Sequence, residues 1–163
     1  MKRIIIISII LGLLMSLGVM SSYAQVEKTR YNHVVVSGQR INMPDMPAKM
    51  SDIYFRMYQE RLDFEVCKIV IQDDGARLVV AVTHVEDTVI QFAILADYED
   101  GEIQIRETPT STCTCTGTCM NGCDPEYLGG TKWRCTNCVF SEEPEPQCIK
   151  IVSASQPWPG GNQ

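Results

Sequence analysis

The sequence is poor in basic residues, in histidine and, beyond its first twenty residues, in long hydrophobic runs. It has 14 lysines and arginines against 20 aspartates and glutamates, and two histidines in 163 residues. Nucleic acids and anionic membrane surfaces are bound by clustered lysine and arginine, so this balance excludes both as expected partners. No stretch after Met20 is long and apolar enough to span a bilayer.

The N-terminus has the three parts of a secretory signal peptide. Lys2 and Arg3 precede an apolar run from Ile4 to about Met20, and small and polar residues follow as far as Ala24. The sequence predicts a signal peptide over residues 1–24, removed by cleavage after Ala24, and a secreted or periplasmic protein. The mature chain has 12 basic and 20 acidic residues, a net charge of −8, and we expect it to carry no transmembrane anchor.

Motifs for nucleophilic or acid–base catalysis are lacking. His33 and His84 stand in runs typical of strands, and neither lies near a serine or cysteine in a nucleophile motif. The segment 97–102 is similar to a calcium loop only loosely, because Gly101 falls at the fifth position and the EF-hand pattern requires the sixth. We therefore expect a protein that is not an enzyme and that has no cofactor.

Four runs of β-branched and apolar residues, separated by acidic turns, indicate an antiparallel sheet. Asp-Gly between such runs favours hairpins, because type I′ turns need a positive φ at both central positions. The run Leu78–Val82 is apolar on both faces, which predicts a cover on each side of that strand. The expected strands are Phe64–Gln72, Arg77–His84, Val89–Asp97 and Glu102–Glu107, and Tyr31–Val36 is a further short β-rich run that Ser37-Gly38 turns.

One helix is expected between the first strand and the others. Ser51 could cap a helix that ends at Leu62, with a mostly apolar stripe on one face. Pro44 and Pro47 predict a loop over Ile41–Lys49. Four methionines in this region are spaced as thioether ligands for Cu(I) could be, but we interpret them as residues that fill gaps in a core: Met43, Met46, Met50 and Met57.

All eight cysteines lie in the mature chain, and seven of them fall between Cys113 and Cys148. An exported protein meets an oxidising environment, which favours disulfides. Three disulfides among seven cysteines leave one over, and it could pair with Cys67, pair with another chain or stay free. The disulfide candidates are Cys67, Cys113, Cys115, Cys119, Cys123, Cys135, Cys138 and Cys148.

A metal site is the alternative interpretation of this cluster. A zinc ribbon needs two C-x2-C knuckles and the chain has one, Cys135/Cys138, while the ferredoxin spacing is absent. The same pair could act in redox chemistry, but no helix is expected behind it. The alternative cofactor is therefore zinc or another thiophilic metal (iron or copper), bound by thiolates of Cys113, Cys115, Cys119, Cys123, Cys135 and Cys138.

The fold class predicted is α+β: an antiparallel meander of four to five strands with one helix, followed by a small disulfide-rich C-terminal module. The sheet domain is expected over 25–108, a linker over 109–112, the cysteine-rich module over 113–152 and a flexible tail over 153–163. The module has few aliphatic residues and needs cross-links. Its aromatic residues could form a binding surface, or two or three of them its core: Tyr127, Trp133, Phe140 and Trp158.

From these features we expect an exported, non-enzymatic binding or structural protein whose disulfide-stapled module recognises a protein or a glycan at the cell surface. An envelope metal-binding protein that uses the thiolates is the second hypothesis. An exported enzyme that works through acidic residues brought together by folding is the third.

Overall fold

A computed structural model describes residues 31–118, 122–136 and 148–154 of the chain. These residues form an α+β fold with one α-helix and mostly sheet, which confirms the predicted class. Within them, no helix has the length and apolar character needed to cross a membrane. The helices are η1 (Met43–Asp45, 3₁₀) and α2 (Met46–Tyr58), and the strands are β1 (His33–Val36), β2 (Gln39–Asn42), β3 (Val66–Ile71), β4 (Arg77–Val85), β5 (Thr88–Glu99), β6 (Glu102–Ile105), β7 (Ser111–Gly117), β8 (Pro125–Tyr127), β9 (Trp133–Cys135) and β10 (Cys148–Ala154).

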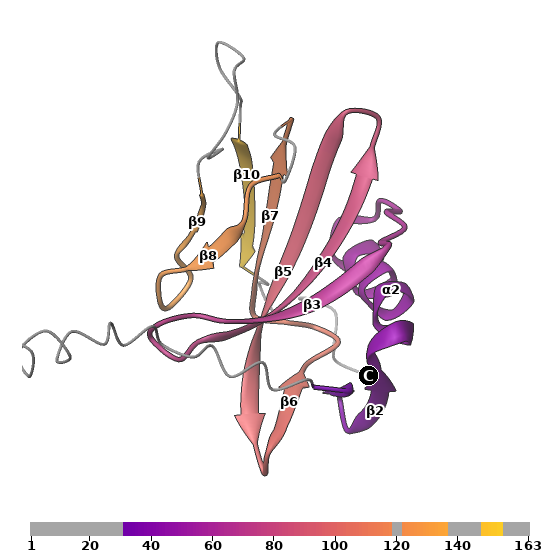
Figure 1. Ribbon diagram of the computed structural model, residues 1–163, viewed down its shortest axis with the longest axis vertical. Coiled ribbons are helices and arrows are strands. Elements are labelled where there is room, and N and C mark those ends of the chain that lie inside the picture. The colour runs from indigo at the N-terminus through magenta and orange to yellow at the C-terminus, as the bar shows by residue number, and fades with distance from the viewer. Residues whose placement is uncertain (1–30, 119–121, 137–147, 155–163) are drawn as a thin grey trace, which may run out of the picture. The chain divides into compact units, whose positions relative to one another are not determined.

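The predicted meander is present as β3, β4, β5 and β6, each antiparallel to the next (Figure 1). The turns follow the expected chemistry. Asp100 and Gly101 both have positive φ, 52° and 82°, as a type I′ turn between β5 and β6 requires. Ser37 and Gly38, at 48° and 85°, make the corresponding turn between β1 and β2.

The predicted number of strands is too low. Among the described residues, eight strands form one sheet. Six of them follow the order β10-β7-β5-β6-β1-β2, β4 also pairs with β5, and β3 pairs with β4; β8 and β9 form a separate pair. Ser111 and Thr112, which the sequence assigned to a linker, lie in β7, and residues 153–154, assigned to a tail, lie in β10. The segment STCTCTG alternates β-branched threonine with small, buried cysteine, and this is a strand pattern.

The helix begins and ends earlier than predicted. It runs from Met46 to Tyr58 instead of Ser51 to Leu62, and the expected loop 41–49 contains the end of β2, η1 and the first turn of α2. Pro47 stands in that first turn, where a missing N–H is tolerated. Ser51 is no cap: its hydroxyl donates to the Pro47 carbonyl at 3.1 Å and accepts the Phe64 N–H at 3.0 Å.

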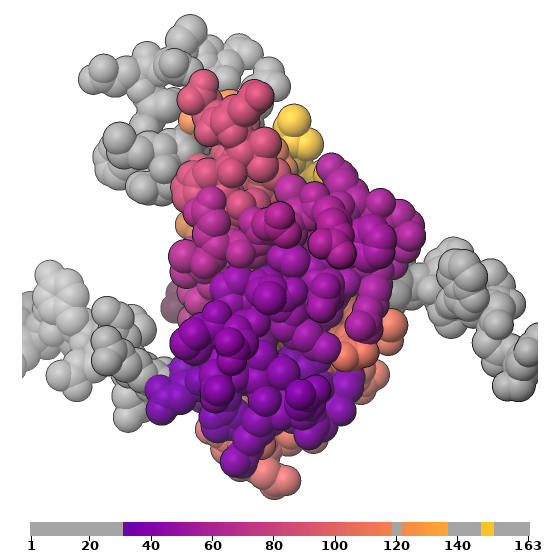
Figure 2. Space-filling view, turned by 90° about the vertical axis from the view of Figure 1, so that its right-hand side faces the viewer, coloured from indigo at the N-terminus to yellow at the C-terminus, as the bar shows by residue number. Residues whose placement is uncertain are grey.

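Both faces of β4 and β5 are covered, as the run Leu78–Val82 predicted. On the helix side, α2 packs over β1, β4, β5 and β6, and Phe92 lies at the centre of a cluster of aromatic rings. Figure 2 looks onto this side, where the residues of β2 and α2 (indigo and purple) occupy the middle of the surface. Met46 and Met50 are fully buried there, in accordance with a role in the core. On the opposite side, β8 and β9 cover Leu78, Val80 and Ala93 (Figure 1).

Gly122, in the segment that leads to β8, has no room for a side chain. An added Cβ would lie 2.7 Å from Cγ1 of the buried Val89, and the φ of Gly122 is +70°. We expect Gly122→Ala to lower the free energy of unfolding by about 1–3 kcal/mol in urea titrations, since the clash adds to the left-handed backbone cost. Gly130→Ala is the matched control, because φ is +62° there and nothing lies within 4 Å. Equal losses in the two variants would contradict the close contact.

Candidate functional site: a three-cysteine cluster and an adjoining groove

Strand β7 positions the first two cysteines of the candidate site. It is hydrogen-bonded to β5 on one side and to β10 on the other, so it lies inside the sheet. Side chains alternate along a strand, and Cys113 and Cys115 therefore share the face that β8 and β9 cover, while Thr112 and Thr114 face the helix side. On that side, the hydroxyls of Thr112 and Tyr58 lie 3.0 Å apart.

Two disulfides join the described parts of this region. Cys115 of β7 is bonded to Cys135 of β9, with their Cα atoms 5.7 Å apart, and Cys123 is bonded to Cys148 of β10, with Cα atoms 6.0 Å apart. The first bond fixes β9 on the sheet, and the second joins β10 to the segment before β8. Trp133 adds a buried hydrogen bond of 2.7 Å from its Nε1 to the Ser111 hydroxyl.

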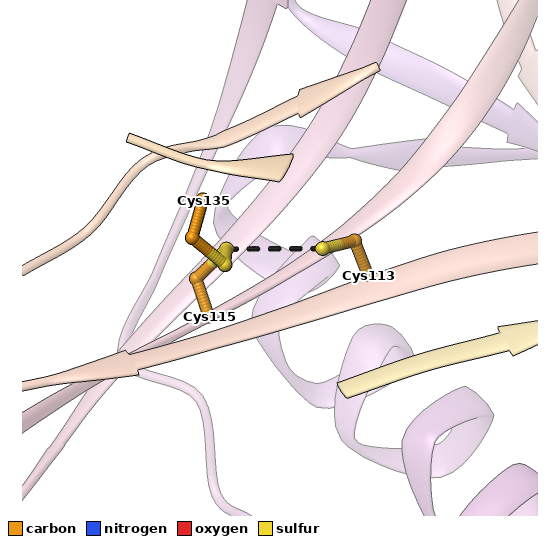
Figure 3. A group of neighbouring side chains, drawn as sticks. All are labelled: Cys113, Cys115 and Cys135. Carbon is orange, nitrogen blue, oxygen red and sulfur yellow. Dashed lines mark hydrogen bonds between the residues drawn. A yellow bond between two sulfur atoms is a disulfide. The ribbon is translucent and has the colours of Figure 1, made fainter. Parts of the chain in front are cut away.

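Cys113 and the Cys115–Cys135 disulfide together form a cluster of three sulfur atoms (Figure 3). The three Sγ atoms of Cys113, Cys115 and Cys135 lie within 4.8 Å of one another, and those of Cys113 and Cys115 are 3.7 Å apart. Cys113 is a free thiol with no exposed surface. Burial raises the pKa of its thiol to about 11, although the nearby Lys150 ammonium opposes this. We call these residues the three-cysteine cluster.

The other cysteines of the sequence prediction have different positions. Cys67, in β3, is a half-buried free thiol on the helix side of the sheet, and burial raises its pKa to about 12. It is therefore not the partner of the unpaired cysteine of the tail. Of the six proposed metal ligands, three meet in the cluster, and Cys123 is bonded to Cys148 instead. Cys119 and Cys138 lie outside the described residues.

The burial of the two free thiols has a measurable consequence. At neutral pH we expect iodoacetamide to alkylate Cys113 in the folded protein at about one hundredth of the rate of an ordinary thiol, since the shift from 9.0 to about 11 lowers the thiolate fraction by that factor. The rate should rise with pH, and denaturant should make Cys67 and Cys113 equally reactive. Peptide mapping by mass spectrometry measures both sites, and fast labelling of folded Cys113 at pH 7 would contradict its burial.

A groove of about 540 Å³ lies between the turn after β3 and strand β8. The amide of Gln72 joins its two walls: it donates to the Tyr127 carbonyl at 3.3 Å and accepts the Tyr127 N–H at 3.1 Å. Lys68 and Asp124 form an ion pair of 3.1 Å across the same two segments. The lining residues are Val70, Gln72, Asp73, Asp74, Pro125, Glu126, Tyr127, Leu128 and Thr136.

The aromatic candidates divide between this groove and the core. Tyr127 lines the groove and is half-buried, with its hydroxyl donating to the Gly130 carbonyl at 3.1 Å. Trp133 has 3% of its surface exposed and packs against Tyr127, with ring centroids 5.1 Å apart. Trp133 thus belongs to the core of the region, which was the alternative stated for these residues. Phe140 and Trp158 lie outside the described residues.

Several residues of the groove had no signal of their own in the sequence. Asp73 and Asp74 were interpreted as a hairpin turn, and the turn is there, but it also forms one wall of the groove.

The two histidines lie in strands, as expected. His33 in β1 is 3.3 Å from a Glu102 carboxylate oxygen, and His84 in β4 is 3.1 Å from one of Glu65.

Comparison with protein-family models, with curated proteins and with solved structures gave no match to this chain.

Proposed function

We propose that the protein is an exported, non-enzymatic binding protein and that it recognises a basic segment of a partner protein at the groove between the β3 turn and β8. The observation that carries this proposal is the composition of the groove. Its nine lining residues include three carboxylates and no lysine or arginine, and they also include apolar groups. Leu128 is 48% exposed at the edge of the groove.

The groove rests on a frame that is cross-linked by disulfides. Cys123–Cys148 and Cys115–Cys135 bracket β8 and β9 in sequence and join them to β7 and β10. A surface that is ordered before binding loses little conformational entropy on association. This favours a recognition role for the stapled region, in agreement with the function predicted from the sequence.

Charge favours a basic partner. Asp73 and Asp74 are exposed at the turn, while Glu126 is paired with Arg134 through bonds of 2.6 and 2.9 Å. One oxygen of Asp74 accepts the Ala76 N–H at 2.9 Å, which leaves the other oxygen for a ligand. The net charge of the whole chain, −6, adds a long-range attraction for cations. A lysine or arginine beside an apolar residue therefore fits the groove chemically.

The test measures binding of labelled peptides to the full-length protein by fluorescence anisotropy. Peptides rich in lysine, arginine and leucine should bind, and their affinity should fall as salt is added. Leu128→Ala should weaken binding about fivefold, as is usual for a contact worth roughly 1 kcal/mol, and a double variant Asp73→Asn, Asp74→Asn should weaken it by a similar factor. Asn keeps the acceptor that the turn uses at position 74.

Asp87→Asn is the control for the loss of an exposed carboxylate elsewhere, because Asp87 is also exposed but lies in the turn between β4 and β5. It should leave the affinity unchanged. Binding of a neutral oligosaccharide in place of the basic peptides would replace the proposed partner with a glycan. Equal weakening by Asp87→Asn and by the groove variants would refute the groove as the site.

The second candidate function is metal binding, and the three-cysteine cluster is the observation in its favour. Three sulfurs within 4.8 Å of one another suit a thiophilic ion such as zinc or copper(I). Two of them are joined in a disulfide, so an ion could bind only after a two-electron reduction of Cys115–Cys135 by an external thiol.

We expect Co²⁺ added to reduced protein to give a thiolate charge-transfer band that Cys113→Ser weakens and Cys67→Ser does not. The same weak band in oxidised and reduced protein would exclude this candidate.

A further inference from the structure

A buried thiol lies beside a disulfide in the three-cysteine cluster, and this arrangement permits a covalent reaction within the protein. Cys113 Sγ is 3.7 Å from Cys115 Sγ, and no pair of the three sulfurs is more than 4.8 Å apart. We propose that Cys113, Cys115 and Cys135 form a thiol–disulfide exchange site, in which Cys113 can replace Cys115 as the disulfide partner of Cys135.

The step is balanced within the cluster. Cys113 loses its proton and its thiolate attacks Sγ of Cys135, so that a Cys113–Cys135 bond forms while the Cys115–Cys135 bond breaks. The electron pair of the broken bond goes to Cys115, which takes up a proton. One disulfide and one thiol are present before and after the step, so no oxidant or reductant is needed.

Strand geometry favours the exchange product in which Cys113 is bonded to Cys135. Attack on Cys115 would join residues two apart on one antiparallel strand, whose Cα atoms are about 6.8 Å apart at about 3.4 Å per residue. This is at the upper limit for disulfides, about 6.8 Å, and the usual value is 5.5–6 Å. Attack on Cys135 joins β7 to β9 instead, two strands that the Cys115–Cys135 bond already connects. Exchange at Cys135 therefore keeps β7 joined to β9 and avoids a bond at the upper limit of Cα separation within one strand.

The arrangement would protect the staple between β7 and β9 from external thiols. Cys135 is the most exposed of the three residues, since it is half-buried and the other two are buried. A small thiol that attacks Cys135 forms a mixed disulfide there and releases Cys115. Either Cys113 or Cys115 can then attack Cys135, expel the small thiol and restore a bond to β7. The proposal is independent of any ligand in the groove.

Burial sets the rate of exchange. The reacting species is a thiolate, and the pKa of Cys113 is raised to about 11. Below that pH, the thiolate fraction and hence the exchange rate should rise about tenfold per pH unit. Lys150 is in the neighbouring strand β10 and lowers the cost of forming the thiolate.

The test locates the free thiol in full-length protein that carries Cys67→Ser, which removes the other free thiol of the described residues. Samples are unfolded in mild acid in the presence of N-ethylmaleimide and are then digested. Tandem mass spectrometry identifies which cysteine carries the label. In the variant that also carries Cys115→Ser, we expect neither Cys113 nor Cys135 to be labelled, because they are bonded to each other. The matched variant Cys113→Ser should keep the Cys115–Cys135 bond.

A second measurement does not depend on how the Cys115→Ser variant folds. Protein that retains all three cysteines is kept at a series of pH values from 7 to 10 before trapping. The label should lie mainly on Cys113 at first and then appear on Cys115 as well, about tenfold faster for each pH unit. Label on Cys113 alone at every pH, or label on both Cys113 and Cys135 in a folded Cys115→Ser variant, would overturn the proposal.

Discussion

A chain that ends at residue 108 is expected to lose a large part of its stability. It would lack β7, β8, β9 and β10, so β5 would lose the six residue pairs that it makes with β7. Leu78 and Val80 would also lose the residues that cover them, which now leave at most 1% of each residue's surface exposed. Burial of one such side chain contributes about 1.5–3 kcal/mol, so the two together amount to roughly 3–6 kcal/mol. A domain of this size has about 5–15 kcal/mol in total.

The measurement is a thermal melt of the 25–108 fragment beside the 25–163 chain, with a dye that binds exposed apolar surface. We expect a broad, early transition and strong dye binding in the fragment. The helix-side core lies entirely within residues 31–108, and it is the reason to expect residual structure. A sharp transition within a few degrees of that of the longer chain would instead establish the sheet domain and the cysteine module as separate folding units, as the sequence suggested.

The elements that the sequence predicted well are those with a local signal. Asp100-Gly101 and Ser37-Gly38 fixed two hairpins, because few other residues adopt positive φ at both turn positions. The double-sided apolar run Leu78–Val82 correctly indicated two covers on β4. By contrast, the parallel pairing of β1 with β6 joins segments about 70 residues apart and leaves no mark on either strand alone.

The candidate site was harder to predict, because a cysteine can either cross-link a loop or serve as a small buried residue in a strand. Within a Gly- and Thr-rich segment, Cys113 and Cys115 indicated a cross-linked loop, but their alternation with Thr112 and Thr114 is a strand period, and it could have been recognised. Connectivity had no such signal, since eight cysteines allow 105 complete pairings. The sequence also had no signal that Cys113 is a free thiol, because this depends on where β9 crosses β7.

Loss of the Cys123–Cys148 disulfide is expected to lower the free energy of unfolding by about 3–4 kcal/mol, because the bond closes a loop of 25 residues. The bond ties β10, an edge strand, to the segment before β8, and without it the unfolded chain gains freedom. Alanine is the replacement at both positions, since a serine hydroxyl at the fully buried Cys123 would add a separate cost. Urea titration under non-reducing conditions measures the change.

The matched control is the double variant Cys67→Ala, Cys113→Ala. It also deletes two sulfur atoms, but both belong to free thiols, so no loop in the unfolded chain is opened. We expect it to lower the free energy of unfolding less than the disulfide variant does. The difference between the two variants is the contribution of the cross-link. A reducing agent should remove that difference, because it opens the same loop in the control. If the two double variants unfold at the same urea concentration without reductant, the bond contributes no stability. The staple would then serve only to hold β10 in place in the folded state.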